Sequence, residues 1–260
     1  MSVAIEHFAK LDAYAVSTPD SQGRRDKFMQ HFDGMFKSIT FVPPVAFDDM
    51  HEQGKDFKRR LMLTSQTVPN ADKMSNYVFT DKDVEQLDTR RKYNRTNDAG
   101  PHSYEAYAAS ESLSLTVKGI LEYFLDSDSE SIMVLEDDAE PRMKVLDTVD
   151  CIPVCDVLGW GAFYSGVAKD TKALQSNMQP CWNKLHFRNR FWSATAVEWT
   201  RAGAEAYVQM HKDMPAVFND ISCKLLVSNY GMDIRSLEPV GIIQNSVSVI
   251  NGNRVAMANA

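Results

Sequence analysis

The sequence lacks the long apolar runs and short motifs that mark several large protein classes. No run among its 260 residues approaches the roughly 20 apolar residues that span a bilayer. It has no GxGxxG after its first predicted strand, no GxxxxGKS/T loop and no GxSxG elbow. Dinucleotide oxidoreductases, P-loop kinases and common serine hydrolases therefore lose their main support. Residues 1–10 carry Glu6 and His7 in place of a basic start and an apolar core. We expect no transmembrane segment and a cytoplasmic location.

The sequence is also poor in cysteine, and its cysteines form no CxxC pair. The four are Cys151, Cys155, Cys181 and Cys223, and no matching pair of Cys or His follows at the spacing of a zinc site. We expect reduced and mostly buried thiols in preference to a metal site or a disulfide.

Positive charge is in deficit, with 28 Lys and Arg against 35 Asp and Glu and a formal net charge of -7. This balance disfavours a protein whose whole surface binds nucleic acid. Two basic clusters, 58–60 and 90–95, nevertheless lie in a polar stretch at about 47–102. They are either solvated surface or a binding surface for a diphosphate or an anionic acceptor, and the sequence leaves both open.

The hydrophobic content of 44% permits a sizeable core, and the length allows one full α/β domain or two small ones. We expect a single domain over residues 1–260. Ser110 or Ser112 is the predicted cap of the clearest helix. Residues 251–260 have little to pack and are predicted to be mobile. Strands are expected at 11–16, 39–42, 132–135 and 191–199, extended pieces at 233–237 and 240–243, and helices at about 24–36, 110–125, 200–207 and 219–230.

The most informative segment is the apolar run 132–135, which ends in Glu136, Asp137 and Asp138. The run predicts a strand buried on both faces, so three acids stand at its carboxyl end, where open α/β sheets bind ligands. Clustered carboxylates repel one another unless a cation or several donors hold them, which favours Mg²⁺ or Mn²⁺ with a phosphate-bearing substrate. Alternation along a strand should place Glu136 and Asp138 on one side and Asp137 on the other. The alternative is a solvated acidic turn.

Taken in chain order, the segments of this sequence resemble those of a family 25 type glycosyltransferase. That family is the group of lipooligosaccharide-modifying galactosyltransferases and related collagen-modifying enzymes. The resemblance spans nearly the whole chain. Segment 134–138 matches the acidic motif, which is the family's most specific element. Leu115 or Thr116 lies where the family typically has a histidine. The other similar pieces are 13–16 with Arg24 and Arg25, 112–114, 156–159, 195–197, 201–204, Asp220, Pro239, Gln244 and Ser246.

The resemblance implies a GT-A-like, Rossmann-type mixed sheet flanked by helices. It further implies a nucleotide-diphosphate sugar donor, with uridine diphosphate suggested by the family alone, and a Mn²⁺ or Mg²⁺ ion that neutralises the leaving diphosphate. Asp138 is then the direct metal ligand, and Asp137 and Glu136 hold the metal indirectly or bind donor hydroxyls. Arg24 and Arg25 are candidates for binding the nucleotide or diphosphate, or else solvated residues at a helix start.

Family members invert the anomeric centre, which requires a base for the acceptor hydroxyl. Asp220 is the candidate base, with a helix cap as its alternative role. Glu198 and His186 are weaker candidates. The tryptophans considered either as sugar-stacking platforms or as core residues are Trp160, Trp182 and Trp192.

Three functions remain open from the sequence. The first is transfer of a sugar to a glycan hydroxyl. The second is a viral DNA-modifying glycosyltransferase that acts on hydroxylated bases and uses the basic clusters, in which case binding would fall steeply with salt. The third is a non-catalytic nucleotide-sugar or carbohydrate-binding protein on the same scaffold.

Overall fold

The computed structural model describes residues 2–45, 104–161, 163–164, 179–186, 191–192, 195–213 and 219–244. The basic insertion predicted at 47–102 and the tail predicted at 251–260 lie outside these residues. None of the helices in the described part is long and apolar enough to span a membrane.

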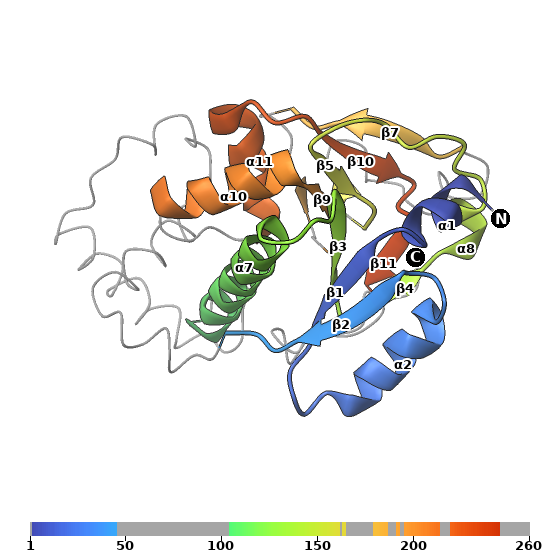
Figure 1. The fold of residues 1–260 in the computed structure, drawn as a ribbon, viewed down its shortest axis with the longest axis horizontal. Coiled ribbons are helices and arrows are strands. Elements are labelled where there is room, and N and C mark those ends of the chain that lie inside the picture. The colour runs from blue at the N-terminus through green and yellow to red at the C-terminus, as the bar shows by residue number, and fades with distance from the viewer. Residues whose placement is uncertain are drawn as a thin grey trace, which may run out of the picture.

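The described residues form a mixed α/β fold in which helices flank one central sheet (Figure 1). Its helices are α1 (Val3–Phe8), α2 (Gln22–Phe32), α7 (Tyr104–Leu125), α8 (Met143–Leu146), α10 (Arg201–Asp213) and α11 (Asn219–Tyr230). Its strands are β1 (Asp12–Val16), β2 (Ser38–Val42), β3 (Ser131–Glu136), β4 (Ala139–Pro141), β5 (Val157–Gly159), β6 (Phe163–Tyr164), β7 (Cys181–Lys184), β8 (Phe191–Trp192), β9 (Ala196–Thr200), β10 (Ile234–Glu238) and β11 (Ile242–Gln244).

Within the described part of the chain, seven strands make the central sheet, in the order β2-β1-β3-β9-β5-β10-β7. β1, β2 and β3 are parallel, and β9 runs antiparallel to both of its neighbours, β3 and β5. The pairs β4–β11 and β6–β8 form two small separate sheets. The predicted mixed sheet flanked by helices is therefore confirmed at this level.

The chain reverses its direction of travel across the sheet at β1. From β1 it passes through α2 to β2 on one side, and later through α7 to β3 on the other side. The carboxyl ends of β1 and β3 thus flank a topological switch point, the place where open α/β sheets bind ligands.

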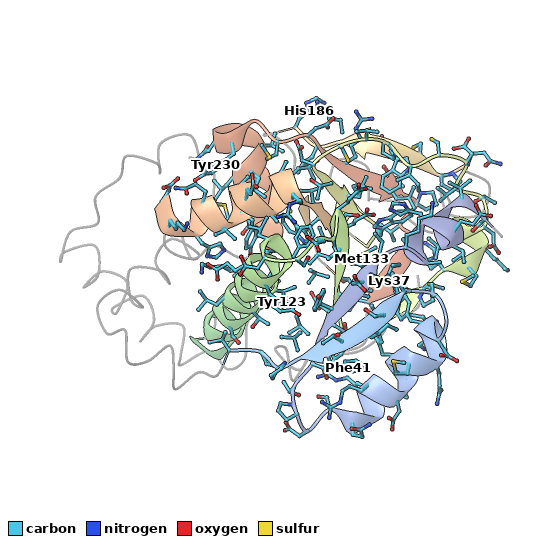
Figure 2. All side chains as sticks on the ribbon, in the orientation of Figure 1. Lys37, Phe41, Tyr123, Met133, His186 and Tyr230 are labelled. Atoms are coloured by element: carbon cyan, nitrogen blue, oxygen red, sulfur yellow. The ribbon has the colours of Figure 1, made fainter. Side chains whose placement is uncertain are left out.

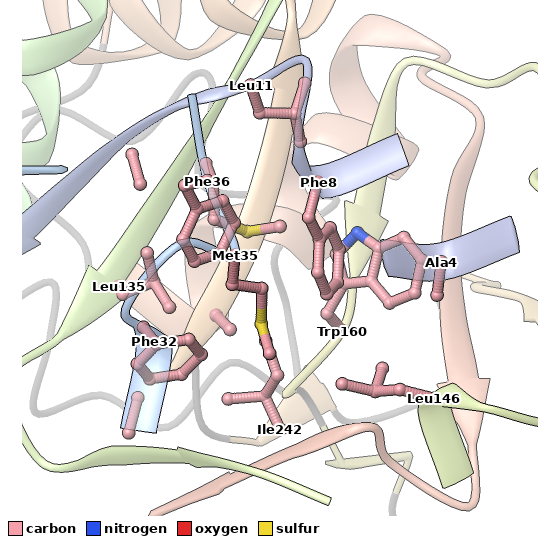
Figure 3. Packing of buried hydrophobic residues seen from close by; sticks show 14 of the residues in the cluster. Ala4, Phe8, Leu11, Phe32, Met35, Phe36, Leu135, Leu146, Trp160 and Ile242 are labelled. Atoms are coloured by element: carbon pink, nitrogen blue, oxygen red, sulfur yellow. The ribbon is translucent and has the colours of Figure 1, made fainter. Parts of the chain in front are cut away.

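The two faces of the sheet are buried by different helices. Ile132 and Val134 of β3 pack with α7, α10 and α11, whereas Met133 and Leu135 pack with α1, α2 and α8. In the core between the sheet and helices α1, α2 and α8, Phe8 lies edge-on to Trp160, with ring centroids 4.5 Å apart (Figure 3). The same division holds at the edge of the sheet, where Phe41 faces α2 while Tyr123 lies on α7 (Figure 2). The prediction that β3 is buried on both faces is confirmed.

Helix α7 begins earlier than its sequence pattern predicts. It starts at Tyr104, so neither Ser110 nor Ser112 caps it. The Ser112 hydroxyl donates instead to the Val45 carbonyl at 2.6 Å, and Thr116 Oγ1 accepts from the Val45 N–H at 2.9 Å. These two hydrogen bonds join the chain beyond β2 to the middle of α7. Ser112, which the sequence suggests as a helix cap, therefore makes a tertiary contact instead.

Two other predictions from the sequence need correction. The strand predicted at 191–199 is divided into β8 and β9. The cysteines are free, as expected, but Cys151 and Cys181 are exposed, so the expectation of mostly buried thiols is wrong for these two. Burial does raise the pKa of the Cys155 thiol to about 12, which makes it a poor nucleophile at neutral pH.

Candidate functional site

The acidic segment lies at the carboxyl end of β3, held between the ends of β1 and β9. The Glu136 N–H donates to the Thr195 carbonyl at 3.0 Å, and the Asp137 N–H donates to the Val16 carbonyl at 3.2 Å. Asp137 and Asp138 are only 6% and 8% exposed. Two of the three acids are therefore buried beside the switch point, which disfavours the alternative of a solvated turn.

Asp137 faces α2 and meets the first of the two predicted arginines. Arg24 Nη1 lies 3.0 Å from Asp137 Oδ1, and Arg24 Nη2 donates to Ser21 Oγ at 2.9 Å. The Ser21 hydroxyl in turn contacts Thr18 Oγ1 at 2.5 Å. Asp137 Oδ2 is buried and has no hydrogen-bond partner among the described residues. The loop after β1 thus orients the Arg24 guanidinium toward one oxygen of the buried Asp137 carboxylate.

Glu136 and Asp138 meet a residue from the other end of the chain. Gln244 Nε2 lies 3.2 Å from Glu136 Oε2 and 3.0 Å from Asp138 Oδ2. One amide group therefore joins both acids, while Asp137 turns to Arg24. The three side chains divide as predicted, but not through strand alternation, because β3 ends at Glu136 and Asp137 and Asp138 lie in the turn before β4.

Backbone contacts between distant segments place Gln244 there. Strand β11 pairs with β4, opposing Gln244 to Ala139, and the Gly241 and Ile242 N–H groups donate to the Trp160 carbonyl at 3.0 and 3.1 Å. A Cβ atom on Gly161 would lie 2.9 Å from the Ile242 carbonyl oxygen. Glycine at 161 permits this close approach, which allows β11 to lie where Gln244 reaches the acids.

The second arginine is directed away from the acids. Arg25 Nη2 donates to the Pro19 carbonyl at 2.6 Å and to Gln22 Oε1 at 3.1 Å, and its guanidinium lies 6.0 Å from the centroid of the Phe41 ring. The structure therefore brings Arg24, but not Arg25, to the acidic segment.

The structure places the candidate bases at different positions in the fold. Asp220 is in the first turn of α11, but its side chain is outside the described part of the structure, so its role stays a prediction. Glu198 is buried within β9 opposite Met133 and contacts His7 Nε2 and Trp160 Nε1, each at 2.9 Å. It is an internal hydrogen-bond acceptor and does not lie at the acidic segment.

His186 is exposed beyond β7, the edge strand farthest from β2 (Figure 2), and the structure does not bring it to the acids. Trp160 is fully buried, so stacking on a sugar is excluded for it. Trp182 is partly buried and donates through Nε1 to the Cys151 carbonyl at 2.9 Å. The Trp192 side chain lies outside the described part.

The acids do not form a complete metal cage. Within the described residues, no three His, Cys, Asp or Glu side chains converge as a metal-binding group. Mg²⁺, however, usually keeps several waters and uses only one or two carboxylates together with substrate phosphates. Glu136 and Asp138, which share one donor, and the buried Asp137 Oδ2 fit a site of that open kind.

Sequence reasoning missed Gln244 and Ser21 as site residues. Gln244 is 106 residues from Asp138 in the chain, and no spacing rule connects them. The resemblance to family 25 did include Gln244 in a closing segment, and that was its one available signal. Comparison with protein-family models and with curated proteins gives no match, so the function is argued from the geometry of the site.

The two adjacent arginines provide a matched test of the site. We expect Arg24→Ala to lower the free energy of unfolding by about 2 kcal/mol, because it leaves the buried Asp137 carboxylate without its cation. Arg25→Ala should change stability far less, since its contacts are exposed. Urea unfolding at pH 7 measures both. Equal losses for the two variants would show that Asp137 does not depend on Arg24.

Proposed function

We propose that this protein is a metal-dependent glycosyltransferase with a GT-A-like fold, which transfers a sugar from a nucleotide-diphosphate sugar, with UDP as the expected nucleotide, to a hydroxyl of a glycan acceptor. The observation that carries the proposal is the division of the three acids. Asp137 is bound to Arg24 beside the switch point, while Glu136 and Asp138 together face Gln244.

This arrangement suits a donor that carries both a diphosphate and a sugar. A diphosphate needs positive charge, and Arg24 supplies a guanidinium in the first turn of α2, after the loop that follows β1. A divalent cation bound by Asp138 and Asp137 would supply Lewis-acid neutralisation of the leaving diphosphate. Glu136 is then available to accept a hydrogen bond from a donor hydroxyl.

The chain's own residues define what happens around the anomeric carbon. Cleavage of the sugar–phosphate bond develops positive character there, by analogy with glycoside hydrolysis, and nearby carboxylates stabilise that charge. We assign Asp220 the role of base that takes the proton of the acceptor hydroxyl, with inversion of the anomeric centre. The sheet supports a GT-A-like reading through its parallel β1–β2–β3 half and its acid-tipped strand at the switch point.

A donor screen tests the proposal. The purified chain is incubated with a panel of nucleotide sugars, with and without Mn²⁺, and the released nucleotide diphosphate is measured. We expect release from at least one donor, from a UDP-sugar first, and only when the cation is present. Calorimetric binding of a nucleotide sugar with no release under any condition would show a non-catalytic binding protein. Absence of both binding and release would refute the proposal.

A further inference from the structure

The Gln244 carboxamide lies between two carboxylates and contacts both of them through the same nitrogen, at 3.2 Å from Glu136 Oε2 and 3.0 Å from Asp138 Oδ2. An amide nitrogen carries two N–H donors, so each carboxylate receives one of them. Like charges held close together repel unless donors or a cation hold them. The Gln244 amide is one such donor for both carboxylates.

An amide donor and a cation compete for the same carboxylate oxygens. The Gln244 side chain can resolve the competition because its two ends differ: Nε2 donates, whereas Oε1 is a carbonyl oxygen of the kind that hard divalent cations bind. A half-turn about the last side-chain bond exchanges these two atoms while the rest of the residue stays in place.

The backbone around Gln244 is arranged so that such a turn stays within the side chain. Strand β11 is paired with β4, and its first residue is bonded to the Trp160 carbonyl. Gly161 approaches the Ile242 carbonyl closely. The side chain itself is exposed, so the amide has room to turn at the solvent side of the acids.

We propose, as a deepening of the function proposed above, that Gln244 is a positioning residue that changes its role with the cation. In the cation-free protein its N–H groups hold Glu136 and Asp138 together. When a divalent cation binds Asp138, the amide turns and directs its oxygen toward the cation. Gln244 thereby keeps the acids ready for the cation.

Mn²⁺ alone, without any nucleotide sugar, tests this role by titration of the full chain, with the free-ion paramagnetic resonance signal as the readout. We expect Gln244→Glu to tighten Mn²⁺ binding by about tenfold, because it replaces the amide oxygen with a charged ligand. We expect Gln244→Met, which has no oxygen, to weaken binding by about tenfold. Without Mn²⁺, Gln244→Glu should unfold at a lower temperature than the wild type, and Mn²⁺ should reverse the difference.

Gln209 offers a matched control. Its Nε2 also donates to a carboxylate, Asp213 Oδ1 at 2.8 Å, within α10, so Gln209→Glu makes the same chemical change elsewhere. We expect its Mn²⁺ affinity to equal that of the wild type. The role of Gln244 is refuted if Gln244→Glu binds no tighter than the wild type, if Gln209→Glu tightens equally, if Gln244→Met binds as the wild type does, or if the wild type binds no Mn²⁺. Mn²⁺ binding in the expected order without nucleotide release would instead refute the glycosyltransferase and leave this role standing.

Discussion

Asp138→Ala is expected to reduce nucleotide diphosphate release by at least about a hundredfold, with the fold retained, because it removes a carboxylate at the centre of the proposed electrostatic stabilisation. Asp138 is 8% exposed and accepts a hydrogen bond from Gln244 at 3.0 Å. Losing that bond should cost only about 1 kcal/mol of stability. Activity should therefore fall far more than stability does.

The measurement compares release rates in Mn²⁺ for the wild type, Asp138→Ala and a control, with circular dichroism and thermal unfolding as checks on folding. Asp147→Ala is the control, since Asp147 is an exposed carboxylate at the end of α8. We expect it to retain the wild-type rate. Near wild-type turnover by soluble, folded Asp138→Ala would remove the argument for a cation at the acidic segment.

Arg201→Met is expected to have the largest effect on stability, lowering the free energy of unfolding by about 3 kcal/mol. Arg201 begins α10 and donates to the carbonyls of Leu125 at 2.6 Å, Ser127 at 2.8 Å and Ser129 at 3.4 Å. These carbonyls end α7 and form the turn into β3. Hydrogen bonds from a charged group are stronger than neutral ones, and the substitution leaves their acceptors unsatisfied.

Methionine keeps most of the apolar stem of Arg201 over Phe124, whose ring centroid lies 5.6 Å from the guanidinium carbon. The loss therefore reports the hydrogen bonds more than packing. Arg235→Met is the control because, among the described residues, Arg235 forms its ion pair locally, with Asp233 at 3.0 Å, and a much smaller change is expected. Urea unfolding measures both variants. A loss below about 1 kcal/mol for Arg201→Met would mean that water replaces the guanidinium at these carbonyls.

The elements that were predicted correctly are those with long and regular hydrophobic patterns in the sequence. The apolar run 132–135 predicted β3 and its two buried faces, and helical spacing predicted α7. Helix α7 nevertheless begins at Tyr104, and Ser112 binds Val45, a partner that no local rule reveals, so it does not cap the helix. Segment 191–199 was divided although its β-branched and aromatic composition suggested one strand.

The place of the acidic segment at the end of β3 followed from the sequence alone, because an apolar run that ends in three acids is a local property. The neighbours of those acids were decided only by tertiary structure. Adjacent arginines on α2 point different ways, so that Arg24 meets Asp137 and Arg25 meets Pro19. Gln244 reaches Glu136 and Asp138 because β11 pairs with β4 and glycine at 161 admits its backbone. Contacts between residues more than a hundred positions apart depend on how the packed elements meet, which the periodicity of a sequence does not encode.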